Sequence, residues 1–477
     1  MNNSPASSSL MSPATLLQAK RTLRTWMNRR PEDSMPPFLS GGLPMLGHTK
    51  NFGQDPVGLL QRGWDEHGEV FTFNLMGTPA VAMIGPEANE AFFRAPDEVL
   101  SPKEAYRLMT PVFGKGIAYD AEPEIMDQQL AFLYPALKKS SLERYAAHMA
   151  AEADAYFDRW GNEGEFDVND FGNELTMYAS TRSLLGAEFR SKLDTHFAEL
   201  YHHLDASLTP LAYFFPYAPI PRFIRRDRAR KQLVKLFEDI VESRRKSGGE
   251  DDLLQALIDA RYKDGRALTL DEITGLIITI VFAGHHTSGA LSAWTVVEML
   301  RHKDHLQPLR EEMLRLHGAR GTQTFKSLDS AERLEHFIME TERLHPPIIV
   351  MMRKAIEEFS YRHFRIPAGT MMVTTPSVSH VLPHVFKNPL AFDPSRFAEP
   401  RAEHKTHPYN MISFGGGKHR CIGLHFAYLQ MKAIMSVLLR RFDLQLATEP
   451  GSYEPNYDFL LVGPKKPARV RYRRIAD

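Results

Sequence analysis

A glycine-rich stretch that contains the only cysteine is the most specific chemical pattern in this chain of 477 residues. Residues 414–423 read Phe-Gly-Gly-Gly-Lys-His-Arg-Cys-Ile-Gly, and the apolar run after them predicts a helix over 424–439. Successive glycines let the backbone approach a flat ligand closely. A cysteine just before a helix gains from the helix dipole and from loop N–H groups, which predicts a lowered thiol pKa for Cys421 and hydrogen-bond donors to its sulfur. The alternative is an inert, buried cysteine.

The same glycines do not form a dinucleotide-binding loop. That loop needs its third spaced glycine at position 420, together with a strand–helix–strand setting. Arg420 occupies the position instead. The sequence therefore does not support a dinucleotide-binding function for this loop.

Glu340 and Arg343 lie three residues apart in a segment of helical periodicity. Residues at this spacing share one face of a helix, so the two side chains can form an ion pair. A solvated surface pair is the common meaning of such spacing. A buried pair that supports the core is the alternative.

A long apolar segment with a polar cluster at its centre follows Thr269. Thr269 and Glu272 have the spacing of a capping box, so a helix is expected to begin there and to run to about residue 300. About thirty residues make a rod of roughly 45 Å, which must cross the interior because it is apolar on most sides. Gly284 leaves room beside the backbone for a small ligand. Thr287 either bonds the carbonyl four residues back or serves chemistry together with His286, whose imidazole titrates near pH 6.5.

The composition excludes some classes of protein. Lys plus Arg and Asp plus Glu both number 58, which gives no sign of the basic face that a nucleic-acid partner requires. Hydrophobic residues make up 43% of the chain, enough to bury a large core. A single cysteine permits no intramolecular disulfide, in keeping with a reducing compartment.

The chain divides into a short tail and one large unit. Residues 1–35 contain no apolar run of about 18 residues, so no transmembrane anchor is expected. The stretch 15–30 mixes apolar and basic residues and is either an amphipathic helix on a membrane surface or an ordinary terminal helix. Residues 36–477 are expected to form a single domain, mainly α with small β-sheets, including a hairpin over 70–75 and 80–84.

The cysteine loop is similar to the haem-binding loop of the cytochromes P-450. The matching positions are Phe414, Gly417, Cys421 and Gly423. Glu340 and Arg343 resemble the E-x-x-R motif of that family, and Arg396 matches its later arginine partner, so a structural role is implied for all three. The resemblance implies the P-450 fold, a long central helix over a buried haem b, and Cys421 as the thiolate ligand of the iron. In that family the thiolate donates electron density for O–O cleavage.

Two further segments are similar to the sterol 14α-demethylases of this superfamily. Residues 106–120 resemble their substrate-roof segment, and residues 284–288 resemble their G-x-H-T-S. This implies that Thr287 and His286 deliver protons during catalysis. It implies haem contacts from Tyr106, Tyr119, Tyr134, Arg353, His419, Phe414, Gly415 and Gly423. It implies an apolar sterol cavity lined by Leu108, Met109, Phe113, Phe282, Ala283, Ile348, Val350, Met352, Leu460 and Leu461.

The implied reaction is three successive oxidations of the sterol 14α-methyl group, which end in release of formate and a 14,15 double bond. Each uses dioxygen and two electrons, and no flavin or NADPH motif is present. A ferredoxin-type partner with an NAD(P)H-dependent reductase is therefore expected. Candidate docking residues are Lys138, Lys139, Lys418 and Arg440.

Other expectations follow from the same resemblance. Leu108 favours a lanosterol-like substrate, and azole inhibitors are expected ligands. A bacterial-type monomer without a membrane anchor is expected, in the cytoplasm or peripherally at a membrane surface. Two alternatives stay open: a P-450 hydroxylase of another sterol, a terpenoid or a fatty acid, and a haem-thiolate sensor without turnover. The pairing of His286 with Thr287 favours an enzyme over a sensor.

Overall fold

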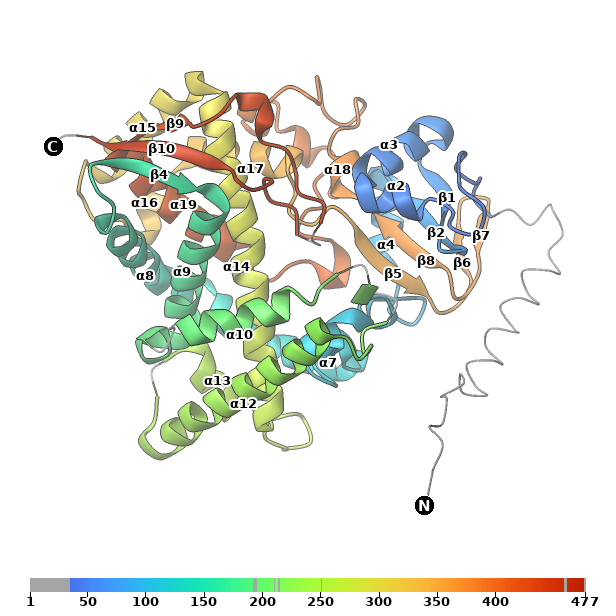
Figure 1. The fold of residues 1–477 in the computed structure, drawn as a ribbon, viewed down its shortest axis with the longest axis horizontal. Helices are drawn as coiled ribbons and strands as arrows, with labels where there is room; N and C mark the ends of the chain where they lie inside the picture. Colours follow the sequence, from blue (N-terminus) through green and yellow to red (C-terminus); the bar gives the residue numbers. More distant parts are fainter. Residues whose placement is uncertain are drawn as a thin grey trace, which may run out of the picture.

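The computed structural model describes residues 35–191, 195–209, 211–212, 215–249, 251–458 and 461–475. The expected terminal helix over 15–30 lies outside these residues. The described chain is mainly helical with three small sheets, as the periodicity predicted. Figure 1 shows most helices on one side of the molecule and the largest sheet on the other.

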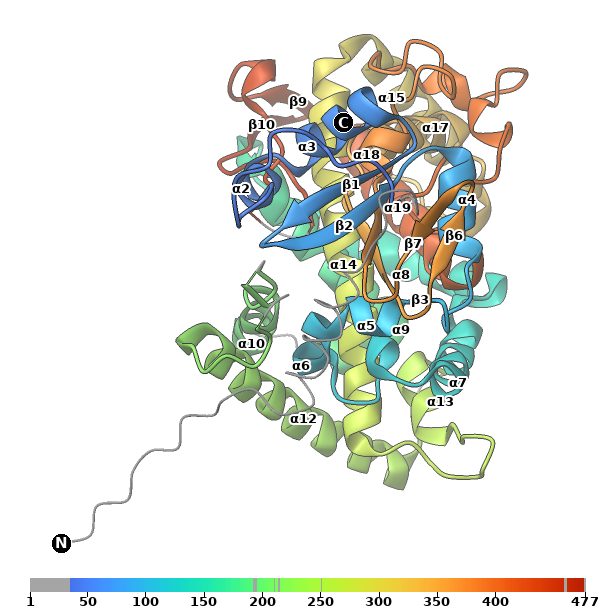
Figure 2. The same ribbon diagram turned by 90° about the vertical axis from the view of Figure 1, so that its right-hand side faces the viewer.

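Helix α14 (Leu270–Arg301) is the central element of the fold. The predicted capping box is confirmed, because the Thr269 side chain accepts from the Glu272 amide while the Glu272 side chain accepts from the Thr269 amide. Both views show the helix running through the middle of the molecule (Figures 1 and 2). Its side chains are buried around most of its circumference, as expected of a rod that crosses the interior.

Helix α9 (Val168–Ser191) packs along α14 at a close crossing built on two glycines. A Cβ added at Gly172 would lie 2.4 Å from the carbonyl oxygen of Gly289, and one added at Gly289 would lie 2.5 Å from Asn173 Oδ1. The missing side chains therefore let the two backbones approach. This contact fixes α14 just beyond its polar centre.

The other α-helices of the described residues pack around α14 or beside the largest sheet (Figure 1). They are α2 (Thr49–Gln54), α3 (Pro56–His67), α4 (Pro86–Arg94), α5 (Pro102–Ala105), α6 (Thr110–Phe113), α7 (Pro123–Leu133), α8 (Lys139–Asp158), α10 (Thr195–Asp205), α12 (Pro221–Ser247), α13 (Leu253–Asp259), α15 (Lys303–His317), α16 (Phe325–Asp329), α17 (Glu332–Leu344), α18 (Pro376–Ser379) and α19 (Leu424–Arg441). Helix α19 is the helix predicted after the cysteine loop. In Figure 2, α12 lies across the lower end of the α14 rod.

The largest sheet has the strand order β1-β2-β8-β5-β3. Its strands are β1 (Val70–Leu75), β2 (Thr78–Met83), β8 (Met371–Thr374), β5 (Met351–Ala355) and β3 (Leu100–Ser101). Strands β1 and β2 form the predicted hairpin, with Met76 and Gly77 at the turn in left-handed conformations. The other sheets are β4-β10-β9 (Glu163–Asp167, Arg469–Arg474, Phe442–Leu446) and β6-β7 (Phe359–Tyr361, Phe364–Ile366).

Among the described residues, two helical segments have the length and hydropathy of a membrane span, namely 270–301 and 417–441. About 72% and 67% of their most apolar windows are buried inside the protein. Core helices of this kind are apolar because they pack against protein. Their composition is explained by the fold.

Candidate functional site

The loop before α19 holds Cys421 through backbone hydrogen bonds. The amide of Cys421 donates to the carbonyl of Phe414 at 2.8 Å, and the amide of Gly415 donates to the carbonyl of Ile412 at 2.8 Å. Gly415 and Gly417 have φ of 68° and 58°, the left-handed region that favours glycine. A Cβ at Gly417 would also lie 2.2 Å from a backbone oxygen of α4. The glycines therefore close the loop against α4.

Cys421 is surrounded by protein, yet its side chain presents accessible surface. It therefore lines an open space. Burial raises the pKa of the thiol, and the Gly423 N–H and the Arg420 guanidinium oppose the rise without overcoming it. The expectation of a lowered thiol pKa is wrong, because desolvation outweighs the loop donors. A coordinated metal cation would still hold the sulfur as a thiolate.

The centre of α14 provides a second accessible surface inside the molecule. Ala283 is exposed although Val281, Phe282 and His285 around it are buried. A Cβ added at Gly284 would meet only Ser180, at 3.8 Å. The predicted room beside Gly284 is confirmed on that side. An exposed alanine in the middle of a buried helix requires an internal space beside it.

Five of the ten predicted apolar cavity residues belong to one cluster. Leu108, Phe113 and Phe282 are buried together, with Met109 and Leu461 packed against them. The Phe113 and Phe282 rings are 5.9 Å apart between centroids. This cluster also includes the start of α19 next to Cys421. The space between the cysteine loop and α14 is therefore apolar.

The other predicted cavity residues are placed differently. Ile348 reaches the cluster through a β-bridge to Leu461. Val350 and Met352 pack against the apolar cluster of β1 and β2 instead, although the Met352 amide donates to Tyr106 Oη at 3.1 Å. Leu460 lies outside the described residues. The predicted cavity residues from 106–120 and from α14 therefore share one cluster, whereas Val350 and Met352 belong mainly to another.

Aromatic and cationic side chains gather beside Cys421. The rings of Tyr106 and Tyr119 stack at 4.7 Å, and burial raises the pKa of Tyr119 to about 12, with Tyr106 adding to the rise and Arg353 opposing it. The Cys421 sulfur contributes to the same shift, which places the thiol near this group. Arg353 is buried and donates to the Met352 carbonyl at 2.8 Å.

His419 has a partner that sequence reasoning missed. Its Nε2 lies 2.5 Å from Asp97 Oδ1, and Lys418 contacts the same carboxylate at 3.1 Å. Burial alone would raise the pKa of Asp97, but His419 and Lys418 lower it overall. The only feature in the sequence that could have predicted an acidic partner here is the adjacent basic pair Lys418 and His419. Tyr134 lies on the surface with 53% of its area exposed, so the site as it stands does not include it.

The polar centre of α14 contains a second missed carboxylate. Thr287 Oγ1 donates to the Ala283 carbonyl at 2.7 Å, which is the ordinary arrangement of a helical threonine. His286 Nε2 lies 3.6 Å from Asp205 Oδ1 at the end of α10. Burial lowers the pKa of His286, and the Asp205 carboxylate opposes that shift. Asp205 is partly exposed, so the three residues lead from solvent towards Ala283.

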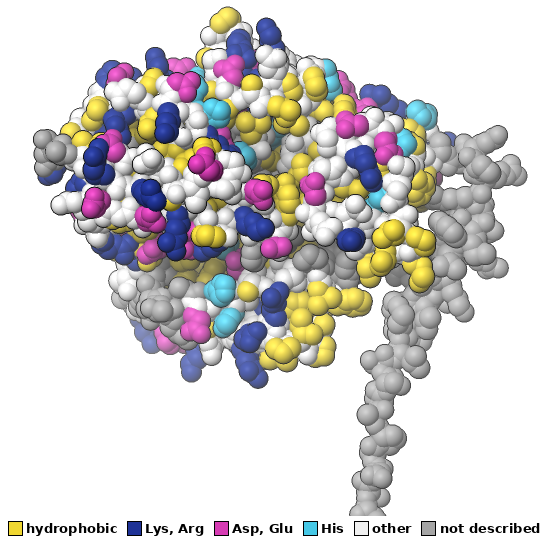
Figure 3. Space-filling model, turned by 45° about the horizontal axis from the view of Figure 1, so that its top comes forward, with side chains coloured by type: hydrophobic (Ala, Val, Ile, Leu, Met, Phe, Trp, Pro, Cys, Tyr) yellow, Lys and Arg dark blue, Asp and Glu magenta, His cyan; other side chains and the backbone are white. Residues whose placement is uncertain are grey.

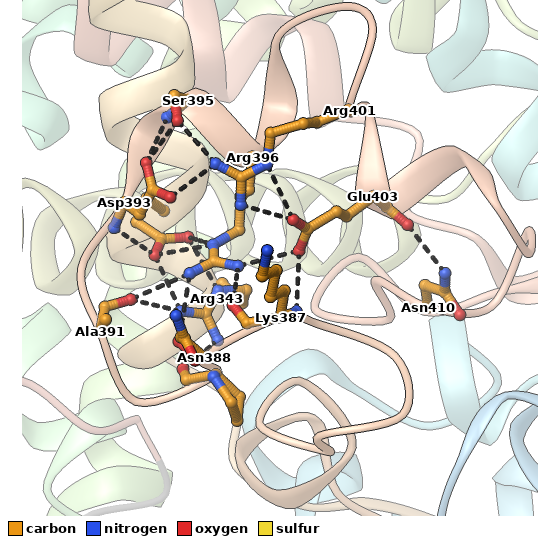
Figure 4. A network of polar contacts seen from close by, with 12 residues as sticks. Arg343, Lys387, Asn388, Ala391, Asp393, Ser395, Arg396, Arg401, Glu403 and Asn410 are labelled. Atoms are coloured by element: carbon orange, nitrogen blue, oxygen red, sulfur yellow. Dashed lines mark hydrogen bonds and ion pairs between the residues drawn. The ribbon is translucent and has the colours of Figure 1, made fainter.

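Glu340, Arg343 and Arg396 form a fully buried ion network (Figure 4). Arg343 donates to both carboxylate oxygens of Glu340 at 2.8 Å, and Arg396 Nε donates to both at 3.0 Å. Glu403 extends the network by pairing with Arg396 at 2.9 Å and with Arg401. The surface-pair interpretation is wrong, and the predicted partner Arg396 is confirmed.

The network is tied to the cysteine loop through His380. Arg343 Nη1 donates to the His380 carbonyl at 2.8 Å, while His380 Nε2 accepts from the Ile412 amide at 2.9 Å. Burial lowers the pKa of His380 to about 3, which keeps the ring a neutral acceptor. Because Ile412 also accepts from Gly415, the ion network supports the loop mechanically.

One predicted docking residue is corrected. Arg440 is buried, and its Nη1 donates to the carbonyls of Gly318, Ala319 and Gly321. It therefore joins the end of α19 to the loop after α15 and is inaccessible to a partner. Lys138, Lys139 and Lys418 are exposed.

The residues around Cys421 fit a haem. Within the described ranges, no three His, Cys, Asp or Glu side chains form a group that could hold a metal ion. A lone thiol suits an iron that arrives with four ring nitrogens of its own. The apolar space and the adjacent tyrosines and Arg353 suit a flat apolar group that carries carboxylates.

Three features define the class of haem-thiolate proteins: a long interior helix, a loop with a single cysteine, and a buried Glu-Arg-Arg network that supports this loop. Residues 36–471 match the family model for cytochrome P450, and the chain belongs to the cytochrome P450 family. The chain is 24% identical to the structure described as retinoic acid bound cyanobacterial CYP120A1, with a TM-score of 0.81. That likeness covers 93% of this chain and 100% of the other, and it confirms the fold.

Relatives within the family share more of the sequence. The chain is 40% identical to the sterol 14α-demethylase of Mycolicibacterium vanbaalenii over 443 residues, which cover 92% of this chain and 98% of the relative. It is 38% identical to the sterol 14-demethylase of Arabidopsis thaliana over 469 residues, which cover 97% and 96%.

Proposed function

We propose that this protein is a sterol 14α-demethylase, a haem-thiolate monooxygenase that removes the 14α-methyl group of a lanosterol-like sterol. The observation that carries the proposal is the meeting of residues 106–120 with the centre of α14 in one apolar cluster beside Cys421. These are the two segments that resemble the sterol demethylases. The relatives in Mycolicibacterium and Arabidopsis support the same activity.

Cys421 would hold the iron of haem b. When bound, the haem supplies the iron at which dioxygen is bound and activated. Tyr106, Tyr119, Arg353 and His419 would bind its propionates through phenol, guanidinium and imidazole donors. The stacking of Tyr106 on Tyr119 fixes the two phenols without a charged partner. Asp97 orients the His419 ring through its contact with Nε2.

The apolar cluster would bind and orient the sterol. Leu108, Phe113 and Phe282 present an aliphatic and aromatic wall to a rigid apolar substrate and exclude water from it. Ala283 offers the small surface on α14 beside which the 14α-methyl group can approach. Oxidation to the alcohol and the aldehyde precedes release of formate and formation of the 14,15 double bond. Each step consumes dioxygen and two electrons.

Asp205, His286 and Thr287 would move protons into the site. His286 is largely buried and near Asp205, so it can pass a proton inward after gaining one on the solvent side. The Thr287 hydroxyl is bonded to Ala283 and can turn from that carbonyl towards the accessible space. Its hydrogen bond within the helix thus coexists with a role in catalysis.

The electrons come from a redox partner, for which we propose a ferredoxin with an NAD(P)H-dependent reductase. Lys138, Lys139 and Lys418 lie exposed for an acidic partner. Residues 36–477 act as one catalytic domain in a monomeric protein, and azoles bind the iron as inhibitors.

We place the protein in the cytoplasm, peripherally at a membrane surface. Phe215 and Tyr217 are exposed on the segment before α12, and Arg222 and Arg225 are exposed in the first turns of that helix. Figure 3 shows apolar patches on the lower right of the surface. Apolar residues bordered by arginines favour the interface of an anionic lipid bilayer.

The test is a spectral titration of the purified haem protein with lanosterol, followed by reduction under carbon monoxide. A ferrous–CO band at the thiolate position and a sterol-induced shift to high spin at micromolar concentration are expected. A turnover assay for formate then completes the case. A thiolate band without any sterol response would overturn the sterol assignment and leave a monooxygenase of another apolar substrate.

A further inference from the structure

Glu342 is a second buried carboxyl on α17, and the ion network described above does not use it. It is 2% exposed and points towards α19, where the Tyr428 hydroxyl donates to its Oε2. Ser413, directly before the cysteine loop, lies near enough to affect the carboxyl, while its own hydroxyl is buried without a hydrogen-bond partner. Neither contact belongs to the E-x-x-R pattern.

The surroundings of Glu342 favour a neutral carboxylic acid. Burial raises the pKa of Glu342 to about 7, although Tyr428 and Ser413 lower it. No cation contributes to that shift, in contrast to Glu340, which faces two arginines. A buried carboxylate without a cation is costly. A neutral acid can accept from Tyr428 with one oxygen and donate to the unpartnered Ser413 hydroxyl with the other.

The charged groups on the elements around α17 have other partners. From α19, Lys432 pairs with Glu335 at 2.6 Å. From α14, Glu298 pairs with His345, His302 and Arg301. From α15, Glu312 accepts from the Arg333 and Leu334 amides, and from the following 3₁₀ turn (Pro394–Phe397) Arg396 pairs with Glu340. Directly after α18, burial keeps His380 neutral. On the cysteine loop, Lys418 and His419 pair with Asp97, which leaves Arg420 and Cys421 itself.

Glu342 is connected to Cys421 through the start of the loop. Ser413 precedes Phe414, whose carbonyl accepts the Cys421 amide at 2.8 Å. The Phe414 ring lies 5.8 Å from the Tyr428 ring, so both neighbours of Glu342 also contact the loop residue that anchors the cysteine. The Glu342 charge raises the pKa of the Cys421 thiol, so the carboxyl lies within electrostatic reach of the sulfur.

We propose that Glu342 is a positioning residue for the haem-binding loop. In its neutral form it bridges Tyr428 to Ser413, and its ionisation places a negative charge behind the Cys421 sulfur. The inference rests on the haem-thiolate assignment and is independent of the substrate. Added negative charge opposes reduction of the iron, because the reduced centre carries one more electron.

The sign of the pH dependence follows directly. Below about pH 7 Glu342 is neutral and the haem potential is at its higher level. As the pH rises through this range the carboxylate forms, so the midpoint potential falls. At a fixed applied potential, the ferrous-to-ferric ratio is expected to drop several-fold across this range.

The experiment is a spectroelectrochemical titration of the substrate-free haem protein from about pH 5.5 to 8.5. The wild type is expected to show the fall, while Glu342→Gln keeps the low-pH value throughout. Tyr428→Phe removes a hydrogen bond that lowers the carboxyl pKa, so its fall is expected at higher pH. Glu332→Gln, an exposed carboxyl on the same helix, is the matched control and should behave as wild type. An unchanged fall in Glu342→Gln would overturn the proposal.

Infrared difference spectroscopy between low and high pH gives a readout that does not depend on the haem potential. A carbonyl band of a protonated carboxylic acid is expected in the wild type and in Ser413→Ala, where it shifts with the lost contact. Its presence in wild type and absence in Glu342→Gln would support the neutral bridge. If Glu342→Gln does not fold, an unmoved band in both Ser413→Ala and Tyr428→Phe would refute it. A missing sterol response leaves both measurements intact, so failure of the substrate assignment is distinguishable.

Discussion

At the scale of single residues, the type of a side chain does not determine its charge state or its partners, as Cys421, Thr287 and His286 show. The thiol lies in a loop that offers it N–H donors, yet burial raises its pKa, so the bound iron is needed to stabilise the thiolate. Thr287 makes the ordinary bond of a helical threonine and also faces the accessible centre of α14. His286 depends on Asp205, which lies about eighty residues earlier in the chain.

Thr287→Ala should uncouple oxygen consumption from product formation while leaving sterol binding nearly intact. The substitution removes the hydroxyl that contributes a proton route, whereas the helix remains because alanine is a good helix former, so product per dioxygen should fall by roughly tenfold or more. Oxygen uptake, peroxide and formate are measured together. Thr279→Ala is the matched control, because Thr279 makes the same bond to a carbonyl four residues back on the same helix. Equal coupling in the two variants would remove Thr287 from the proton route.

Asp205→Asn should slow turnover at neutral pH without weakening sterol binding. The carboxylate opposes the burial that lowers the pKa of His286, so its loss should lower that pKa further. Because the His286 ring is protonated only below its pKa, the pH above which turnover declines should be lower in the variant than in the wild type. The measurement is the pH profile of kcat. A profile identical to wild type would show that the proton enters elsewhere.

At the scale of elements, α17 and α19 act together on the loop between them. The Glu340–Arg343–Arg396 network holds α17 to the segment after α18, and His380 passes that support to Ile412. Helix α19 begins three residues after Cys421 and brings Tyr428 against Glu342 and Phe414. The loop thus has one support that carries ion pairs and another that depends on a neutral acid.

Glu340→Gln should destabilise the folded protein by about 3–5 kcal/mol, because the buried guanidinium of Arg343 loses its carboxylate partner and that of Arg396 keeps only Glu403. Chemical denaturation of the haem protein measures the free energy of unfolding, and haem retention should fall with it. Glu104→Gln breaks a surface pair with Arg107 at the same spacing and should cost less than about 1 kcal/mol. Similar losses in both variants would contradict the structural role of the network.

At the scale of the whole molecule, several large apolar side chains are exposed on the surface and do not pack in the core. Phe215 and Tyr217 near α12 and Met45 before α2 are exposed, Met45 to 90%. Two long apolar helices are buried in the core, so their hydropathy is explained by packing. Within the described residues, a peripheral membrane contact would therefore come from the exposed groups.

The paired change Phe215→Ser and Tyr217→Ser should weaken binding to vesicles of anionic lipid by roughly tenfold or more, since each ring that enters the interface contributes about 1–2 kcal/mol. Co-sedimentation with vesicles measures the binding. Leu390→Ser is the matched control, because Leu390 is 81% exposed elsewhere on the surface. Comparable loss in the control, or none in the pair, would contradict membrane contact through this segment.

Short-range patterns could be predicted from the sequence because the interactions behind them are local. The capping box of α14, the hairpin of β1 and β2, and the helix after Cys421 each depend on residues a few positions apart. The cysteine loop and the E-x-x-R pair are local patterns too, so their residues were found from spacing and resemblance.

Tertiary structure alone decided the partners and the charge states. Asp97, Asp205 and Tyr428 lie about 322, 81 and 86 positions from His419, His286 and Glu342 and carry no local signal that links them. The pKa of Cys421 was predicted with the wrong sign because the sequence shows neighbours but not burial, and Arg440 was misplaced for the same reason. Side-chain type and spacing therefore determined which groups can react. The three-dimensional packing determined which charges face each other and which are desolvated, because Coulomb and desolvation energies depend on distances in space.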